Sequence, residues 1–313
     1  MGVRLGLGLA TFPFDDGAGF WRWVRLCEEG GVDSLWQTDR LVTRDAYLEA
    51  MSTMAALAGA TERIKFGMNA VTVTLRDPLV LARQCATIDF LSGGRLLPVF
   101  GIGAAFAPEW AATGRDPKGR GERANEALEL LARLWSEERV TFEGRYFTYR
   151  DATIAPRPVQ QPLPLWIGGH SKAAIRRTAR LGTGWLAGLA SPDRVAPVVR
   201  AIRTELEAVG RSIDADHYGA TIPFRFGSWD DPAVQRLAGA RATQQDAPDP
   251  RAFVAVGDAA AVLERVREYV AAGCSKFVML PLASDSTDVF EQTRQLIAEV
   301  IPVASALPGP LAA

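Results

Sequence analysis

Eight short apolar strands alternate with helices along the chain, and no other feature of the sequence limits its fold as much. The predicted strands cover residues 3–9, 33–37, 64–73, 96–101, 165–167, 184–188, 217–226 and 276–280. The predicted helices cover residues 20–29, 47–60, 78–91, 120–135, 172–181, 192–209, 258–272 and 285–301. Alternating strands and helices form parallel sheets. Eight such pairs therefore predict one α/β domain over residues 1–313, a TIM (β/α)8 barrel.

Two segments do not fit the alternation, and both are predicted to be insertions at the C-terminal face of the barrel. Residues 139–163 contain alternating aromatic residues such as Phe142 and Tyr149, which indicate a hairpin-like excursion. Residues 227–253 are polar and rich in Pro, Asp and Gln, which predicts an irregular insertion. We expect this second segment to close a substrate pocket as a lid.

The composition excludes several functional classes. The formal net charge is −1, so no bulk field attracts nucleic acid or an anionic membrane. No run of about 20 apolar residues is present, and the N-terminus lacks the basic start and cleavage site of a signal peptide. Cys27, Cys85 and Cys274 lie far apart in apolar contexts, which favours reduced thiols in a cytoplasmic protein. No CxxC, HExxH or acidic-loop pattern appears, so we expect no metal site.

Residues that directly follow strands are the functional candidates, because the active site of a TIM barrel lies at the carboxyl ends of its strands. Asp39 and Arg40 follow the second strand and are our catalytic candidates. Asp39 is predicted to be an acid, a base or a hydrogen-bond partner, or else half of an ion pair with Arg40, Arg44 or Arg76. Arg40 is predicted either to hold an anionic group or to be a solvated loop charge.

The glycine pair after the fifth strand predicts an anion site. Residues 165–167 are apolar, Gly168 and Gly169 follow, and Ser171 is a good N-cap for the next helix. Free backbone N–H groups and the helix dipole favour a phosphate there, and glycine lets it come close. A tight βα turn without a ligand is the alternative. His170 is either a donor to the phosphate or a surface residue without a role.

Gly101 and Gly103 follow the fourth strand and resemble the start of a dinucleotide-binding loop. The third glycine of that fingerprint would fall at Phe106, so we reject a dinucleotide site. The two glycines are instead predicted to leave space beside a flat ligand. Ala10 lies at the corresponding end of the first strand.

Five motifs along the chain form a specific combination. They are Gly31-Val32-Asp33-Ser34-Leu35-Trp36 with Asp39, Arg63-Ile64-Lys65-Phe66-Gly67 before Arg76-Asp77-Pro78, Leu91-Ser92-Gly93-Gly94-Arg95, Ile167-Gly168-Gly169-His170-Ser171, and Val256-Gly257-Asp258. This combination resembles the bacterial luciferase-like flavin oxidoreductases over residues 1–188 and 256–300. The resemblance implies a barrel that binds FMN or the deazaflavin F420, both reduced elsewhere and used as diffusible cofactors.

The same resemblance implies roles for individual residues. The glycine loop would take the cofactor phosphate, and a non-prolyl cis peptide bond between Asn69 and Ala70 would lie behind the ring. The candidate cofactor contacts are Ala10, Asn69, Ala70, Gly101, Gly103, Gly168, Gly169, His170 and Ser171.

Three positions depart from the family pattern. Arg40 stands where many F420-using members have histidine, and Asp77 stands where a histidine often precedes the proline. Ile102 stands where luciferase itself has the arginine that holds the flavin phosphate. The sequence shows no strong proton donor. This weakens the case for F420 hydride transfer, if that reaction requires an acid, more than the case for oxygen chemistry on a reduced flavin.

We therefore expect a flavin-dependent monooxygenase or oxidoreductase that uses reduced FMN and oxygen on a small organic substrate. F420-dependent hydride transfer, by a reductase or dehydrogenase, is the alternative within the family. A non-catalytic flavin-binding barrel is the alternative of another class. The expected partners are the small-molecule substrate, a flavin reductase or another source of reduced cofactor, and a second copy of the chain in a homodimer. We expect no nucleic acid and no membrane as partners.

Overall fold

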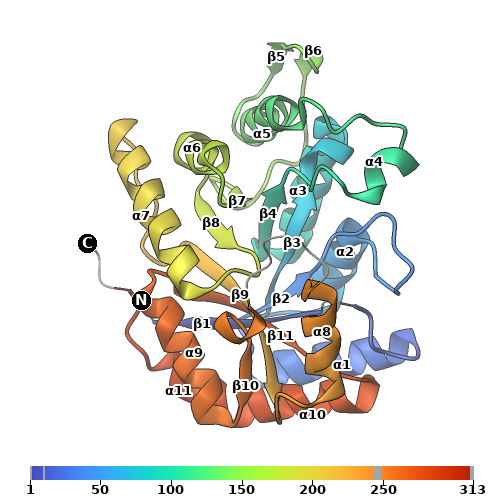
Figure 1. The fold of residues 1–313 in the computed structure, drawn as a ribbon. Helices are drawn as coiled ribbons and strands as arrows, with labels where there is room; N and C mark the ends of the chain where they lie inside the picture. Colours follow the sequence, from blue (N-terminus) through green and yellow to red (C-terminus); the bar gives the residue numbers. More distant parts are fainter. Residues whose placement is uncertain (1, 10, 243–248, 311–313) are drawn as a thin grey trace.

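The protein is a closed barrel of eight parallel strands with helices around it, as predicted (Figure 1). The computed structural model describes residues 2–9, 11–242 and 249–310. The barrel strands, in order around the barrel, are β1 (Arg4–Leu9), β2 (Ser34–Gln37), β3 (Lys65–Thr72), β4 (Leu96–Gly101), β7 (Trp166–Gly168), β8 (Gly184–Ala187), β9 (Tyr218–Phe226) and β11 (Lys276–Pro281). Each strand pairs in parallel with the next, and β11 pairs with β1, which closes the barrel.

Most of the predicted helices form close to the expected positions. They are α1 (Gly17–Glu29), α2 (Ala50–Ala60), α3 (Pro78–Ser92), α5 (Arg120–Ser136), α6 (Lys172–Leu181), α7 (Pro192–Ala208), α9 (Ala259–Ala271) and α10 (Ser286–Gln295). Asp16 caps α1 and Asp77 caps α3, each by accepting a hydrogen bond from the backbone N–H of its helix's first turn. Such side chains pair N–H groups that have no partner inside the helix.

The helix predicted over residues 285–301 is interrupted. After α10, residues Leu296–Val300 form a π-helical turn, and α11 (Ile301–Ser305) completes the segment. Pro302 lies in the first turn of α11 and has no N–H to donate, so the regular hydrogen-bond pattern cannot continue through it.

The insertion at residues 227–253 differs from the prediction. We expected irregular structure, but α8 (Pro232–Ala242) and a 3-10 turn (Pro250–Ala252) form within it. Residues 243–248 of this segment lie outside the described residues. After it, β10 (Ala255–Gly257) pairs with the last three residues of β9, an addition to the sheet that the sequence did not predict.

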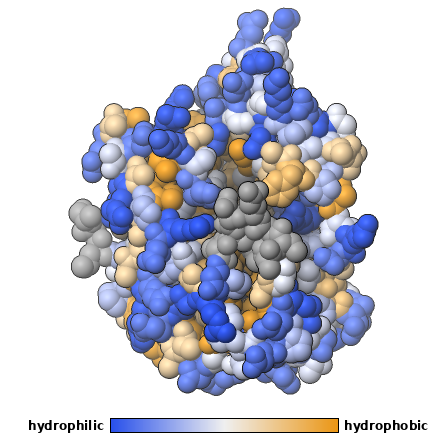
Figure 2. All heavy atoms as spheres, viewed as in Figure 1, coloured by the Kyte–Doolittle hydropathy of each residue, from blue (hydrophilic) through white to orange (hydrophobic). Residues whose placement is uncertain are grey.

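The predicted excursion over residues 139–163 does contain a hairpin, made of β5 (Val140–Glu143) and β6 (Thr148–Ala152). The hairpin projects from the body of the molecule (Figure 1), and its surface is mostly hydrophilic (Figure 2). Glu126 of α5 anchors it by accepting hydrogen bonds from the backbone N–H groups of Arg145, Tyr146 and Phe147.

Two tryptophans pack inside the barrel beneath the carboxyl ends of the strands. Trp36 of β2 and Trp166 of β7 form a buried cluster with Val99, Leu186 and Val278. Glycines on neighbouring strands leave the space for these indoles. A Cβ on Gly67 would lie 2.7 Å from the Trp36 ring, and one on Gly184 would lie 2.3 Å from the Trp166 ring. The interior is therefore a packed core that supports the site above it.

Among the helices in the described ranges, none combines the length and the apolar character needed to cross a membrane.

Candidate active site

The third strand carries an irregularity where the resemblance implied one. The pairing of β3 with β4 shifts register between Met68 and Val71, and the Asn69–Ala70 peptide bond is cis. This arrangement places Ala70 at the carboxyl-end face of the barrel, next to β4 and β7.

Ala70 lies beside two of the predicted glycines. A Cβ added to Gly101 would meet only the Ala70 Cβ, at 3.7 Å, and one added to Gly168 would lie 3.8 Å from the same atom. Three neighbouring strands thus contribute residues with small or no side chains to one surface, which we call the floor (Ala70, Gly101, Gly168). A flat ring can approach the backbone closely at such a surface.

Gly103 has a different explanation. Its φ is +72°, and an added Cβ would lie 2.9 Å from Thr72 Cγ2 and 3.1 Å from Trp110 Cζ2. The space beside Gly103 is therefore filled by protein atoms, which differs from our expectation that this glycine leaves room for a ligand. The nearby Arg120 Nε donates to the Gly103 carbonyl at 3.2 Å and fixes this turn to α5.

Asn69 makes a contact across the barrel. Its Nδ2 donates to Thr221 Oγ1 of β9 at 2.9 Å, and that hydroxyl donates to the Ala187 carbonyl of β8 at 3.1 Å. The chain of two hydrogen bonds joins three strands beside the floor. Thr221 was not singled out from the sequence, because a threonine inside a buried strand carries no local sign of a polar role.

The glycine loop leaves backbone amides exposed at the position of the predicted anion site. Gly169 has a φ of +107°, a conformation that favours glycine, and its carbonyl accepts the Trp185 indole N–H at 2.8 Å. Ser171 caps α6 by accepting from the Ala174 N–H at 3.2 Å. The preceding amides of the first turn have no partner inside the helix, and Gly169, His170 and Ser171 are exposed. A phosphate can therefore reach these amides from solvent.

Asp39 is engaged in an ion pair. Its two carboxylate oxygens accept from the two terminal nitrogens of Arg76, each at 2.8 Å, and Oδ2 also accepts from the Thr72 N–H at 3.0 Å. Burial alone would lower the pKa of Arg76, but the hydrogen bonds and charge of Asp39 raise it. Of the three arginines considered, Arg76 is thus the partner, and both oxygens of the carboxylate are occupied. This geometry favours the ion-pair interpretation of Asp39 over that of an acid or base.

Arg40 faces a carboxylate that the sequence analysis missed. Its Nη1 lies 3.9 Å from Oε1 of Glu109, on the short helix α4 (Pro108–Ala112) that follows β4. The Glu109 side chain is only 6% exposed, and its Oε2 is buried with no hydrogen-bond partner among the described residues. Arg40 also adjoins Tyr47, whose pKa is raised by burial against the opposing effect of the Arg40 charge. An unpartnered buried carboxylate at the mouth of a barrel is a candidate acid or base.

The remaining predicted residues lie as follows. Ala10 falls outside the described residues. Helix α8 of the predicted lid lies at the carboxyl-end face, because its Arg236 approaches the Ala283 carbonyl at 3.4 Å just beyond β11. Arg225, near the end of β9, anchors the start of this segment through an ion pair in which its Nε lies 3.0 Å from Oδ2 of Asp231. A lid role for this segment stays a prediction.

Comparison with a family model gives one match over most of the chain. The model described as luciferase-like monooxygenase matches residues 15–276.

Two of the curated relatives carry the same printed function. The F420-dependent glucose-6-phosphate dehydrogenase of Kineococcus radiotolerans is 34% identical over 216 residues, which cover 66% of this chain and 63% of that protein. The F420-dependent glucose-6-phosphate dehydrogenase of Intrasporangium calvum is 30% identical over 285 residues, 81% of this chain and 83% of that protein. The first match therefore spans less than two thirds of the relative's length.

Solved structures share the fold at lower identity. An F420-dependent secondary alcohol dehydrogenase in complex with an F420-acetone adduct superposes with a TM-score of 0.83 at 20% identity, covering 97% of this chain and 99% of that one. The monooxygenase RslO1 from Streptomyces bottropensis superposes with a TM-score of 0.79 at 20% identity, covering 96% and 99%. At this identity the likeness supports the fold alone.

Proposed function

The chain belongs to the luciferase-like monooxygenase family of oxidoreductases, and from this premise we propose that it is an F420-dependent oxidoreductase that transfers a hydride between F420 and a small alcohol or carbonyl compound. The observation that carries the proposal is the open floor of Ala70, Gly101 and Gly168 directly beside the glycine loop. The relatives from Kineococcus radiotolerans and Intrasporangium calvum, both named as F420-dependent, support F420 over FMN.

The residues at the mouth fit such a cofactor. The floor offers a surface without large side chains for a flat ring, and the Asn69–Ala70 segment would support such a ring. The amides that follow Gly168, with His170 and Ser171, would hold the phosphate. When bound, F420 supplies a two-electron hydride acceptor or donor.

Two features of the chain favour F420 over FMN. By the family resemblance, Ile102 falls at the position of the arginine that holds the flavin phosphate in luciferase, so we do not expect that contact to FMN here. Glu109 supplies the carboxyl group that hydride transfer needs and that the sequence analysis did not find. Reduced FMN with oxygen, our main expectation from the sequence, therefore becomes the alternative.

Glu109 is the residue that we propose moves the proton. Its Oε2 is buried and has no hydrogen-bond partner among the described residues, so this role requires the oxygen to be opened to the mouth when substrate binds. It would then take the hydroxyl proton of an alcohol substrate, or return it to a carbonyl oxygen in the reverse direction. Arg40, at 3.9 Å from the other oxygen, would orient this carboxylate and attract an anionic substrate group. Asp39 would act only as a positioning residue, by holding Arg76 and the Thr72 N–H.

A titration of the purified protein with oxidised F420 and, separately, with FMN tests cofactor choice. We expect F420 to bind at least about tenfold more tightly than FMN, which corresponds to about 1.4 kcal/mol. Gly168→Leu should abolish F420 binding, because a Cβ there is tolerated by the backbone but the rest of the side chain would cover the floor. Gly59→Leu, at a helix position where an added Cβ meets nothing within 4 Å, is the matched control. Equal affinity for both cofactors, or oxygen uptake with reduced FMN, would contradict the proposal.

Turnover tests the proton-transfer residue. F420 reduction is measured with glucose-6-phosphate and with a panel of secondary alcohols. Glu109→Gln should lower kcat by about 10²-fold while the Kd for F420 stays within twofold. A fully active Glu109→Gln protein would remove Glu109 from the mechanism without affecting the cofactor assignment.

The expected partners also remain proposals. An F420-dependent enzyme of this type would need a second enzyme that restores the other redox state of F420. A homodimer is the oligomeric state that we propose, and light scattering of the purified protein would test it.

A further inference from the structure

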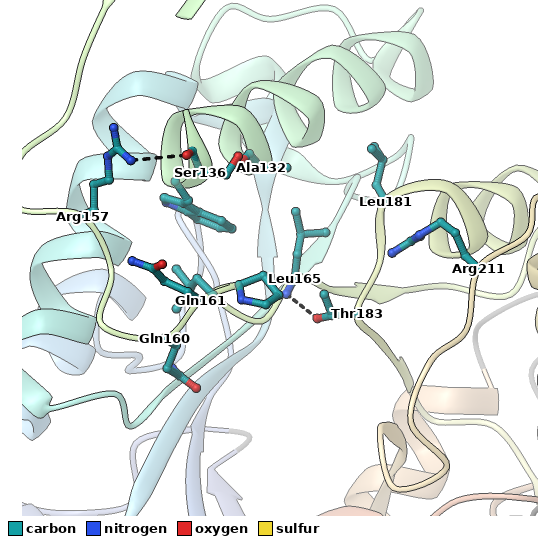
Figure 3. A pocket seen from close by; sticks show the side chains of 12 residues that line it. Ala132, Ser136, Arg157, Gln160, Gln161, Leu165, Leu181, Thr183 and Arg211 are labelled. Carbon is teal, nitrogen blue, oxygen red and sulfur yellow. Dashed lines mark hydrogen bonds between the residues drawn. The ribbon is translucent and has the colours of Figure 1, made fainter. Parts of the chain in front are cut away.

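A pocket, seen from close by in Figure 3, lies where the chain enters β7 and β8, at the amino ends of these strands. Its volume is about 370 Å³. Leu163 and Leu165 line it from the segment that leads into β7, Leu181 lines it from the end of α6, and Trp135 lines it from the end of α5. These positions are at the amino ends of the strands and the carboxyl ends of the helices. Nothing in the proposed hydride transfer uses this pocket.

The inner part of the pocket is apolar. Leu163 and Leu165 are each only 2% exposed, and Trp135 is 6% exposed. The Trp135 indole N–H donates to the Ala82 carbonyl at 3.1 Å, so its only polar atom is already paired. An apolar or aromatic body of a ligand would gain by leaving water here.

The rim carries positive charge without a matching carboxylate in the lining. Arg157 and Arg211 lie at opposite sides of the pocket (Figure 3). Arg157 Nη1 approaches the Ser136 carbonyl at 3.4 Å, whereas Arg211 donates to the carbonyls of Ala179 at 2.6 Å and Gly182 at 3.0 Å. Each guanidinium has five N–H donors, so both keep donors for a ligand.

Neither arginine forms an ion pair within the part of the chain that the structure describes. One acidic group behind the lining is Asp89, which contacts the lining residue Gln160. It is buried and accepts hydrogen bonds from the backbone N–H groups of Val159 and Gln160 and from the Gln160 amide. Its charge is thus directed to these donors and not to the pocket.

We infer that this pocket binds a small organic anion with a flat apolar body and one carboxylate. The volume falls at the low end of pockets that hold small organic ligands. The apolar inner part of the pocket takes the ring. Arg157 at the rim takes the carboxylate through charge-assisted hydrogen bonds, because its single backbone contact leaves more donors free than the two contacts of Arg211 do. Neutral or cationic compounds of the same size would lack the interaction between a carboxylate and the arginine.

The two ends of the barrel are separate sites. The pocket residues Leu163 and Leu165 precede β7, whereas the glycine loop follows it, so the strand lies between the two. A ligand in the pocket therefore leaves the mouth free for F420. The inference does not depend on the identity of the cofactor.

Isothermal titration calorimetry of the full chain with 2-naphthoate tests the site. We expect a sub-millimolar Kd that is unchanged when F420 is present at saturation. The neutral 2-naphthamide should bind at least about fivefold more weakly, because it has the same ring but no charge.

Three variants locate the binding. Arg157→Gln should weaken 2-naphthoate by about fivefold or more, and Ala132→Phe should abolish binding by filling the pocket. Arg139→Gln removes the same charge from the exposed hairpin and should leave the Kd unchanged. Urea unfolding of each variant confirms that the fold is retained, and Arg157→Gln alone suffices if Ala132→Phe does not fold.

Several results would overturn the inference. The inference is wrong if 2-naphthoate gives no heat of binding up to about 10 mM, or if 2-naphthamide binds as tightly as 2-naphthoate. It is also wrong if F420 displaces 2-naphthoate. Unchanged affinity in both Arg157→Gln and a folded Ala132→Phe would also overturn it.

Discussion

Strand β2 has an aspartate near each end, and each aspartate forms an ion pair with a cation from another segment. At the amino end, Asp33 directly precedes β2 and pairs with Lys276, the first residue of β11. At the carboxyl end, Asp39 pairs with Arg76, which follows β3. The sequence presents both as similar acidic residues at strand ends, so their different environments show what each pair does.

The amino-end pair joins strands. Lys276 is buried, with its side chain 9% exposed, and Asp33 is its hydrogen-bond partner. Burial would raise the pKa of Asp33, but the adjacent Lys276 ammonium lowers it below its ordinary value. The amino-end face of a TIM barrel usually contributes to stability.

The carboxyl-end pair is tied to the site. Asp39 is 2% exposed, binds Arg76 through both oxygens, and accepts the Thr72 N–H only two residues after Ala70 of the floor. The same kind of ion pair therefore serves two purposes: Asp33–Lys276 stabilises the fold at one end of β2, and Asp39–Arg76 holds the shape of the site at the other. Four experiments test this difference between the two pairs.

Asp33→Ala should have the largest effect. It leaves the Lys276 ammonium buried without a partner, so we expect the free energy of unfolding in urea to fall by about 3 kcal/mol. The Kd for F420 should stay within twofold, because the mouth is at the other end of the barrel. The double variant Asp33→Leu/Lys276→Met should recover most of the loss, since it removes both charges. A large loss of F420 affinity in Asp33→Ala would erase the contrast between the two ends.

Arg76→Lys should act on the site instead. Lysine keeps the charge but cannot bind both oxygens of Asp39 in parallel, so the segment that holds the floor loosens. We expect the Kd for F420 to rise about tenfold, or about 1.4 kcal/mol. The free energy of unfolding should fall less than in Asp33→Ala, because lysine keeps a positive charge beside Asp39. Fluorescence titration and urea unfolding measure the two quantities on the same sample. An unchanged Kd would mean that Asp39 and Arg76 do not position the floor.

The pH dependence of the unfolding free energy tests the charge on Asp33 in the Asp33–Lys276 pair. Because the pKa of Asp33 is lowered in the folded protein, its contribution to stability is present above the ordinary aspartate pKa of about 3.9 and is lost as the pH falls through the folded value. The difference in unfolding free energy between the wild type and Asp33→Asn should therefore shrink below about pH 4. A difference that stays constant down to pH 2 would contradict a charged Asp33.

Glu49→Gln should have the smallest effect. Glu49 contacts Arg76 at 3.2 Å, but its side chain is 44% exposed, and such exposed ion pairs contribute little. We expect a stability change below about 0.5 kcal/mol that disappears in 1 M salt, and no change in the Kd for F420. A change as large as that of Arg76→Lys would place Glu49 in the same positioning unit as Asp39.

The barrel was predictable because its strands and helices end at residues with clear local signals. The turn before β4 contains Gly93 and Gly94, both with positive φ, and Gly101 ends that strand at the predicted position. Helix α8 was missed because its small residues give little contrast between an apolar and a polar face, and such contrast is what reveals a helix in a sequence.

The site was only partly predictable, because contacts between distant segments decide its chemistry. The sequence offered three arginines as partners of Asp39, and only the path of the chain after β3 selects Arg76. Glu109 comes eight residues after β4, and the turn into α4 brings it back to Arg40. The cis bond at Asn69–Ala70 followed from the family resemblance, since no property of these two residues alone indicates it.

The hydrogen bond from the Trp185 indole to the Gly169 carbonyl gives the glycine loop an intrinsic optical signal. An oxyanion held by the neighbouring amides would polarise this carbonyl, and the indole's ultraviolet emission would change with it. Adding inorganic phosphate to the protein and to Trp185→Phe would isolate this one indole from the other seven of the eight in the chain. Occupancy of the loop would then be readable without any coloured cofactor.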